Sequence, residues 1–179
     1  MHAHKSSAWP LAMIYGALVL YASLYPFEGW RDQGIAPWEF LWAPWPRYWM
    51  GFDVLANVLG YAPLGFLLTL GALRSGRSGH PVWLVWAAAS ALSLVLEGLQ
   101  TYLPMRVPSN VDALLNSLGA WLGATLAFAL ERWGGLDRWS RFRARWFVPQ
   151  ARGALVLICL LYTSPSPRDY AASRMPSSA

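Results

Sequence analysis

Four long apolar segments dominate this chain of 179 residues and restrict it to folds that a lipid bilayer can accommodate. They cover residues 9–25, 52–73, 82–103 and 111–130. Each is close to the roughly 20 residues that an α-helix needs to cross about 30 Å of hydrocarbon. Because a spanning segment in lipid must satisfy its own backbone polar groups, apolar runs of this length predict transmembrane helices. The sequence therefore predicts an all-α, polytopic membrane helix bundle with four transmembrane helices in residues 9–131.

Composition favours a membrane protein over a soluble domain. Charged residues make up 13% of the chain, against about 25% in an ordinary soluble domain. Twelve tryptophans are typical of a protein with aromatic belts at the membrane interfaces. The net charge of +5 is explained by membrane topology and not by nucleic-acid binding, because no RNA- or DNA-binding motif accompanies the arginines.

Lysine and arginine are distributed unequally between the two sides of the predicted bundle. One side carries nine of them: Lys5, Arg74, Arg77, Arg132, Arg138, Arg141, Arg143, Arg145 and Arg152. The other side carries three: Arg31, Arg47 and Arg106. The positive-inside rule places the richer side in the cytoplasm. We therefore expect a multi-pass membrane protein with residues 1–8 and a basic loop at residues 132–152 in the cytoplasm.

The predicted outer connection at residues 26–51 is rich in aromatic side chains. They are Phe27, Trp30, Trp38, Phe40, Trp42, Trp45, Tyr48 and Trp49. Pro37 begins a short helical pattern within this aromatic segment, and Pro44 and Pro46 end it. We expect the segment to lie in the outer headgroup region. The segment would act as a simple membrane anchor, as a lid over polar residues of the helices, or as a platform for lipid headgroups. The sequence is compatible with all three roles.

Polar residues recur at helical spacing inside three of the four apolar segments. Spacings of three and four residues place each group on one helix face. An ionisable group inside a membrane span is costly and is treated as a functional site by default. The predicted outer ends of these helices would bring the groups together beside Arg106. We call this set the polar cluster: Asp53, Asn57, Ser93, Glu97, Gln100, Arg106, Asp112 and Asn116.

The polar cluster has two interpretations at this stage. It is either a structural network that holds three helices together or a pocket for a lipid headgroup or another polar ligand. Arg106 is the basic residue nearest to the three carboxylates, so the sequence predicts a bidentate ion pair with one of them. Three glycines are expected to let the helices pack closely: Gly65, Gly119 and Gly123.

The order of these motifs resembles the VanZ-like family of bacterial membrane proteins. The matching residues are Asn57, Tyr61 and Pro63-Leu64-Gly65-Phe66, then Ser93, Glu97 and Gln100, then Arg106, and finally Asp112, Asn116, Gly119 and Gly123. The resemblance covers residues 52–130. The resemblance implies a location in the bacterial cytoplasmic (inner) membrane. It also implies a role in the cell envelope, because the family takes its name from a protein linked to resistance to teicoplanin. Glycopeptide antibiotics bind a cell-wall precursor at the outer membrane face, where the polar cluster is expected.

The expected function is that of a non-enzymatic envelope protein that affects glycopeptide antibiotic susceptibility. Its partners would be membrane lipids and a lipid-linked cell-wall precursor, with no nucleic acid, and its oligomeric state is left open. The alternative is an intramembrane enzyme that acts on a lipid-linked substrate, with Glu97 or Asp112 as the general acid or base. A third hypothesis is a small transporter or proton-coupled carrier. Such a protein would need charged residues along a path through the membrane, and the inner halves of the helices carry almost none.

No cofactor or metal is expected from the sequence. The single cysteine is Cys159, and the three histidines are His2, His4 and His80. None of these residues has the spacing of a metal-ligand set. The chain also lacks a glycine-rich loop of the kind that binds phosphates or dinucleotides.

The C-terminal part of the sequence differs from the rest. A fifth apolar segment begins near residue 151, and residues 153–162 are predicted to be a partial fifth span, too short to cross. Residues 163–179 are rich in proline and serine. From about residue 160 the sequence resembles translated sequencing-adapter DNA joined to a truncated gene, so residues 163–179 are expected to be a non-native tail. The native alternative is a disordered tail.

Overall fold

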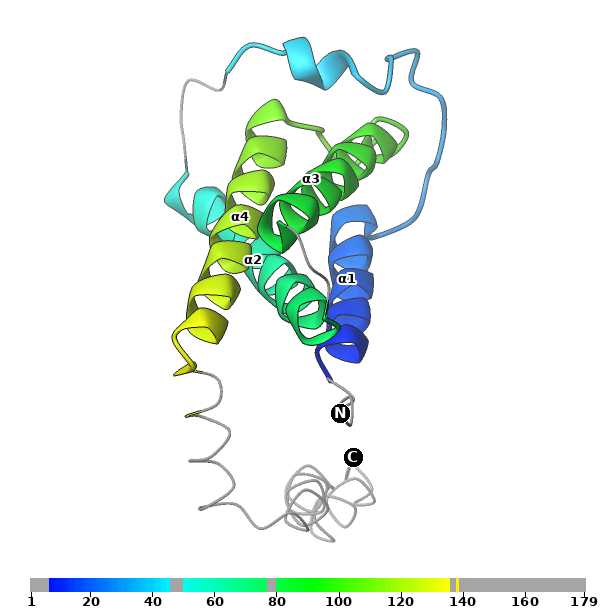
Figure 1. The fold of residues 1–179 in the computed structure, drawn as a ribbon. Helices are drawn as coiled ribbons and strands as arrows, with labels where there is room; N and C mark the ends of the chain where they lie inside the picture. Colours follow the sequence, from blue (N-terminus) through cyan, green and yellow to red (C-terminus); the bar gives the residue numbers. More distant parts are fainter. Residues whose placement is uncertain (1–6, 46–49, 77–79, 136–137, 139–179) are drawn as a thin grey trace, which may run out of the picture. The chain divides into compact units, whose positions relative to one another are not determined.

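A computed structural model of the chain describes residues 7–45, 50–76, 80–135 and 138. Within these ranges the fold is all-helical, as the sequence predicts (Figure 1). In chain order the elements are α1 (Ala8–Leu24), the 3-10 helix η1 (Glu39–Trp42), α2 (Gly51–Arg74), α3 (Pro81–Gln100) and α4 (Asn110–Arg132). The predicted partial fifth span and the tail lie outside the described residues.

Three helices are long and apolar enough to cross a membrane. They are α2, α3 and α4, with 24, 20 and 23 residues. The helix α1 is apolar but has 17 residues, so it extends about 26 Å at 1.5 Å per residue. That length is at the lower limit for a membrane span. Three of the four predicted spans are therefore supported by length and composition.

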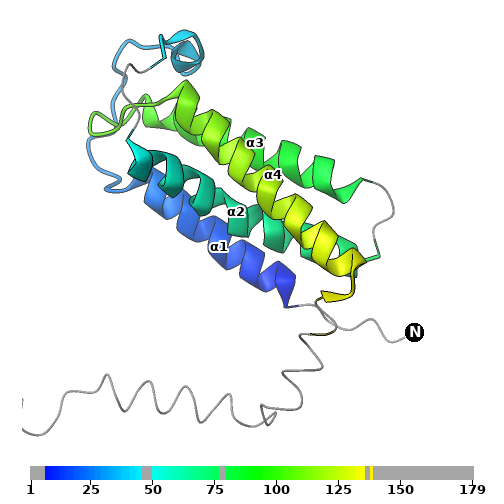
Figure 2. The same ribbon diagram turned by 90° about the vertical axis from the view of Figure 1, so that its left-hand side faces the viewer.

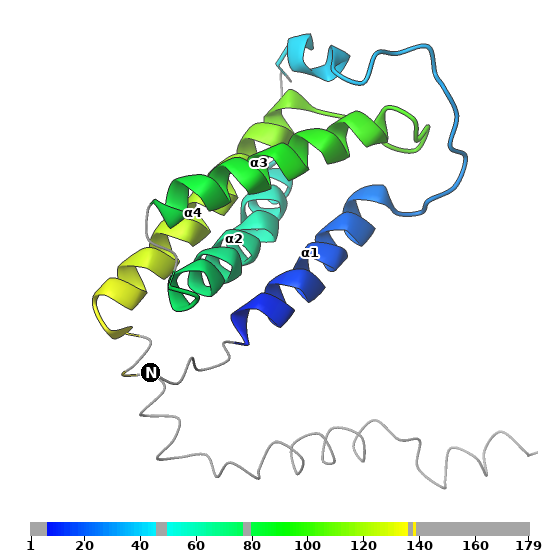
Figure 3. The same ribbon diagram turned by 45° about the vertical axis from the view of Figure 1, so that its right-hand side comes forward.

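The helix α2 lies in the middle of the bundle. It contacts α1, α3 and α4, and its contact with α4 is the most extensive in the fold. The four helices lie side by side and run roughly along one direction (Figure 2). The helix α1 lies at the edge, beside α2 and with less contact to α3 (Figure 3). The helix α1 is therefore held to the bundle mainly by α2.

Small residues explain the closeness of α2 and α4. A Cβ atom added to any of three glycines would overlap the backbone of the facing helix: Gly65 meets Ala120, Gly119 meets Val58, and Gly123 meets Ala62. The two backbones therefore approach to a distance that no larger residue permits. The helix α2 continues through Pro63 as a single element.

The helix α3 ends at Gln100, three residues before the predicted end of this span. The next three residues form turns in place of further α-helix, with backbone bonds from Tyr102 N to Leu99 O (3.1 Å) and from Leu103 N to Gln100 O (2.9 Å). Leu103 precedes Pro104, and the proline ring disfavours helical backbone in the residue before it. The connection between α3 and α4 is therefore longer than expected.

The aromatic segment packs on the end of α3 and on the connection that follows. Arg31 N donates to Tyr102 O (3.0 Å), and Gln33 Nε2 donates to Thr101 O (2.6 Å). Phe40 of η1 is buried, whereas several tryptophans of the segment are exposed: Trp30, Trp38, Trp42 and Trp45. Exposed rings at one end of the bundle suit a membrane anchor. We call this end, which holds residues 24–45 and 101–109, the loop end.

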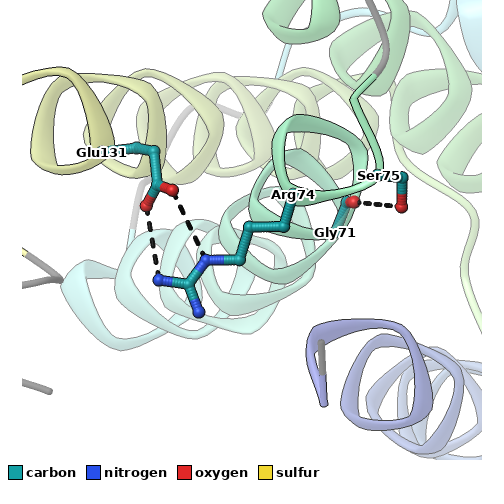
Figure 4. A network of polar contacts seen from close by, with 4 residues as sticks. All are labelled: Gly71, Arg74, Ser75 and Glu131. Carbon is teal, nitrogen blue, oxygen red and sulfur yellow. Dashed lines mark hydrogen bonds and ion pairs between the residues drawn. The ribbon is translucent and has the colours of Figure 1, made fainter. Parts of the chain in front are cut away.

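The opposite end of the bundle joins α2 to α4 through an ion pair (Figure 4). Arg74 Nε lies 3.5 Å from Glu131 Oε1, and Arg74 Nη2 donates to Glu131 Oε2 at 3.5 Å. Ser75 Oγ donates to Gly71 O (2.7 Å) and accepts from Trp9 Nε1 (2.8 Å), which links α1 to the end of α2. Both partners of the ion pair are about one-third exposed, so its contribution to stability is small.

The α2–α4 contact predicts opposite effects for the same substitution at two glycines of α2. Gly65→Ala should destabilise the protein by about 1–3 kcal/mol, because the new methyl group would overlap the Ala120 backbone. Gly60→Ala meets no atom within 4 Å and should be neutral or stabilising by up to about 1 kcal/mol. Thermal unfolding of the purified variants measures both effects. Equal stability of the two variants would contradict the close approach of the helices.

Candidate functional site

A cavity of about 430 Å³ lies at the loop end between α1, α2, α3 and the start of α4. Its wall combines polar and apolar residues. The polar side chains are Ser23, Asn57, Tyr61, Glu97, Gln100, Arg106, Asp112 and Asn116. Six of the eight residues in the predicted polar cluster therefore line one cavity, although they come from three helices and a loop.

The other two members of the polar cluster lie elsewhere. Ser93 is 1% exposed and lies behind the cavity wall, where its Oγ accepts a hydrogen bond from Asn116 Nδ2 (3.0 Å). Asp53 is exposed in the first turn of α2 and does not line the cavity. The sequence predicts that Asp53 and Asn57 share one helix face, with Asp53 one turn nearer the outer surface, and only Asn57 of the two lines the cavity.

The amino-terminal end of α4 is built into the cavity wall. Ser109 is its N-cap, and the Ser109 hydroxyl accepts from Asp112 N (3.3 Å). The backbone N–H of Ser109 donates to Glu97 Oε2 (2.8 Å), and Asn57 Nδ2 donates to Asp112 Oδ1 (3.0 Å). Glu97 is 4% exposed, so its carboxyl group is held inside the protein by the backbone of the next helix. These bonds tie α2, α3 and α4 together at the cavity.

Arg106 and Gln100 hold the carboxyl-terminal end of α1. The last carbonyl groups of a helix have no partner within it. Arg106 Nη2 donates to Ala22 O (2.7 Å), Arg106 Nε donates to Tyr25 O (2.9 Å), and Gln100 Nε2 donates to Ser23 O (3.0 Å). The helix α1 has no basic residue in its last turn. Arg106 therefore supplies the positive charge that is favourable at a helix C-terminus.

The predicted ion pair between Arg106 and a carboxylate is not formed. One ion pair, Arg74–Glu131, occurs in the part of the chain that the structure describes, and it lies at the opposite end of the bundle. The physical reason is that Arg106 directs its Nε and Nη2 to carbonyl groups of α1, while each carboxylate already holds one hydrogen bond, from Ser109 or from Asn57. The carbonyl groups of α1, by contrast, would lack partners without Arg106.

Two buried polar atoms at the cavity wall lack a hydrogen-bond partner among the described residues. They are Tyr61 Oη and Asn116 Oδ1. Tyr61 is 4% exposed and Asn116 is 6% exposed, so bulk water does not reach them freely. An unpaired buried polar group costs free energy, and a bound ligand or water is an ordinary explanation for one.

The contribution of α1 to this cavity was not predicted from the sequence. Val19, Ala22 and Ser23 line it, and the backbone carbonyl groups of the last turn anchor the side chains opposite. Small and apolar residues give no signal of a site, and backbone carbonyl groups are present in every sequence. A helix C-terminus without a basic residue was the one available signal.

The described residues contain a second large cavity, of about 470 Å³, at the opposite end. Its lining is mainly apolar and includes Trp9, Leu68 and Leu84. Its one ionisable residue among those described is His80. No group of three His, Cys, Asp or Glu side chains within the described ranges could hold a metal ion. The chemistry that the described residues offer is therefore concentrated in the cavity at the loop end.

The role of Arg106 as an anchor for α1 predicts a local effect of its removal. Arg106→Gln should lose both hydrogen bonds to α1, at a cost of about 1–3 kcal/mol, and loosen the last turn of that helix. Hydrogen exchange of the amides in residues 19–25 should become faster. Arg31→Gln is the matched control, because the Arg31 side chain is exposed and makes no hydrogen bond to the described residues. Unchanged exchange in the Arg106 variant would contradict the anchoring role.

Comparison with known proteins places most of this structure in one family. Residues 4–131 match the family model described as VanZ/LLP1. The matched range includes α1, α2, α3, all of α4 except its last residue, and every described residue that lines the cavity. No curated protein matches the chain, and no solved structure matches it.

Proposed function

The chain belongs to the VanZ/LLP1 family, and we propose that it is a non-enzymatic membrane protein of the bacterial cell envelope that binds the polar part of a lipid. The ligand would be a phospholipid headgroup or the head of a lipid-linked cell-wall precursor. The polar part would occupy the cavity at the loop end. The acyl or prenyl chain would remain in the membrane beside the bundle.

One observation carries the proposal: a polar interior is joined to an apolar rim. Glu97, Asn116 and Tyr61 are buried in the wall, whereas four apolar lining residues are exposed: Ala22, Ala56, Met105 and Val107. A cavity that opened only to water would not require apolar residues at its rim. A lipid has the same arrangement, with a polar head joined directly to an apolar chain.

The distribution of charge supports an outward-facing cavity. Arg74 and Arg132 lie at the ends of α2 and α4 that are remote from the cavity, and the positive-inside rule favours the cytoplasm for them. In this orientation the N-terminus is cytoplasmic and the cavity opens in the outer leaflet of the inner membrane. The aromatic segment at the loop end would then lie at the outer interface, as an anchor and as a neighbour of bound lipid.

An effect on antibiotic action follows from this location. Lipid-linked cell-wall precursors reach the outer leaflet before they are used, and glycopeptides such as teicoplanin bind them there. A protein that holds the head of such a precursor, or that changes the lipids around it, would alter access of the antibiotic. We therefore propose that the cavity modulates glycopeptide susceptibility.

The alternative of an intramembrane enzyme is favoured by a single observation. Glu97 and Asp112 line the same cavity, as an acid–base pair would. Time-dependent conversion of a lipid-linked substrate by the purified protein, lost in Glu97→Gln, would establish catalysis. Such a result would contradict the non-enzymatic role.

Blocking the mouth of the cavity tests the proposal. Ala22 is exposed on α1 and lines the cavity, so Ala22→Phe should fill its mouth without removing a polar group. Co-purified lipid, measured by native mass spectrometry, should fall by about tenfold, and any glycopeptide phenotype should fall with it.

The matched control is Ala17→Phe, an exposed alanine of the same helix that does not line the cavity. It should retain wild-type lipid. Equal lipid in Ala22→Phe, in Ala17→Phe and in the unmodified protein would count against a lipid site in this cavity.

A further inference from the structure

We infer that the cavity recognises a primary ammonium group, carried by the headgroup of an aminophospholipid such as phosphatidylethanolamine. The inference rests on the proposed function, because it names the chemistry of the lipid that the same cavity would take. Three features carry it: unpaired acceptor atoms, an excess of carboxylates, and the position of Arg106 near an apolar rim.

Acceptor atoms around the cavity exceed the donors that the protein supplies. From the described residues, Glu97 accepts a hydrogen bond at Oε2 alone and Asp112 at Oδ1 alone. Asn57 and Gln100 are both held through their amide nitrogen atoms, so their amide oxygens accept no hydrogen bond from the described residues. Four oxygen atoms thus remain open to N–H or O–H donors from a ligand.

Two further atoms point to a ligand independently of the carboxylates. Asn116 Oδ1 and Tyr61 Oη are buried at the cavity wall without a partner among the described residues. Both side chains are more than nine-tenths buried. Asn116 Nδ2 donates to Ser93 Oγ, so the Asn116 amide atom without a partner among the described residues is the acceptor Oδ1. Asn116 Oδ1 can only accept, whereas Tyr61 Oη can donate or accept, so a ligand rich in donors can satisfy both atoms.

Formal charge favours a cation over a neutral donor. Glu97 and Asp112 are the acidic residues of the described lining, and Arg106 is the basic one. Arg106 directs two of its nitrogen atoms to the carbonyl groups of α1. A sugar hydroxyl group would donate hydrogen bonds but would carry no charge opposite to that of an ionised Glu97 or Asp112. An ammonium group supplies three N–H donors and an opposite charge, and uncompensated buried charge is costly.

Arg106 indicates where the phosphate of the same headgroup would lie. Its Nη1 makes no hydrogen bond to the described residues, so it can still donate to an anion. The neighbours of Arg106 at the cavity are Met105 and Val107, both exposed and apolar. In phosphoethanolamine, two carbon atoms separate the ammonium group from the phosphate ester oxygen. One headgroup can therefore place its amine among the acceptors, its phosphate at Arg106 and its acyl chains beyond the rim.

A series of lipids with identical acyl chains tests the inference on the unmodified full-length protein. The probes are phosphatidylethanolamine, its N-trimethylated analogue phosphatidylcholine, and phosphatidylglycerol, added to detergent-solubilised protein and quantified by native mass spectrometry. Phosphatidylcholine keeps the positive charge but has no N–H donor, and phosphatidylglycerol lacks the amine. Phosphatidylethanolamine should bind about tenfold or more tightly than either lipid.

Substitutions in the cavity identify the residues that bind the ammonium group. Glu97→Gln removes a charge and keeps an oxygen that can accept from Ser109 N, and should weaken phosphatidylethanolamine binding by about tenfold or more while phosphatidylglycerol binding does not fall. Glu131→Gln makes the same change outside the cavity and should retain the preference of the unmodified protein. If Glu97→Gln does not fold, Asp112→Asn replaces it, because its amide oxygen can still accept from Asn57.

The outcomes separate this inference from the proposed function. Equal binding of all three lipids, abolished by Ala22→Phe, would overturn recognition of an ammonium group and leave a lipid site in place. A preference for phosphatidylethanolamine that survives in both Glu97→Gln and Asp112→Asn would also overturn it. Absence of binding for every lipid would contradict both the inference and the lipid-binding function.

Discussion

The close approach of α2 and α4 is the contact on which the rest of this structure depends. Gly119 lies against the backbone of Val58, which is the residue after Asn57. Without a side chain at Gly119, the two helices come near enough for Asn57 Nδ2 to reach Asp112 Oδ1 at 3.0 Å. In a membrane the hydrophobic effect does not drive helices together, so their association depends on dispersion contacts and interhelical hydrogen bonds. Glycines favour both because they let the backbones approach closely. The polar wall of the cavity therefore depends on the close glycine contact between α2 and α4.

The same wall uses backbone groups that helices leave unpaired. Glu97 accepts from the N-cap residue of α4, and Arg106 and Gln100 donate to the last carbonyl groups of α1. Helix ends need such partners, and a membrane offers few of them outside the protein. The polar cluster is therefore structural at some atoms and open at others. Some atoms of the same residues, such as Glu97 Oε1 and Asn116 Oδ1, have no partner among the described residues, and these are the atoms that a ligand can use.

Sequence periodicity was sufficient to predict much of this arrangement. Apolar runs gave all four helices within a few residues, and spacings of three and four residues selected side chains that the fold brings to one cavity. Both inferences depend on helix geometry, which is local. The helix α3 ends three residues before the predicted position, because Pro104 disfavours helical backbone at Leu103.

The remaining differences are non-local. Arg106 was expected to bind a carboxylate, yet its partners are carbonyl groups more than eighty residues earlier in the chain. The position of α1 beside the cavity could not be read from its own apolar sequence. Asp53 shares a face with Asn57, but it lies in the first turn of α2 and outside the cavity. Depth along a helix axis and the neighbour of a helix end depend on packing, which periodicity does not encode.

Thiol cross-linking in the membrane tests most directly whether the polar faces converge. In a Cys159→Ser background, cysteines at positions 57 and 112 should react efficiently with a short bifunctional thiol reagent, because the native side chains are 3.0 Å apart. A pair at positions 59 and 112 should react poorly, since Leu59 is 61% exposed on the outer face of α2. Equal cross-linking of both pairs, or cross-linking of the second pair alone, would contradict the convergence of the polar faces of α2 and α4 at the cavity.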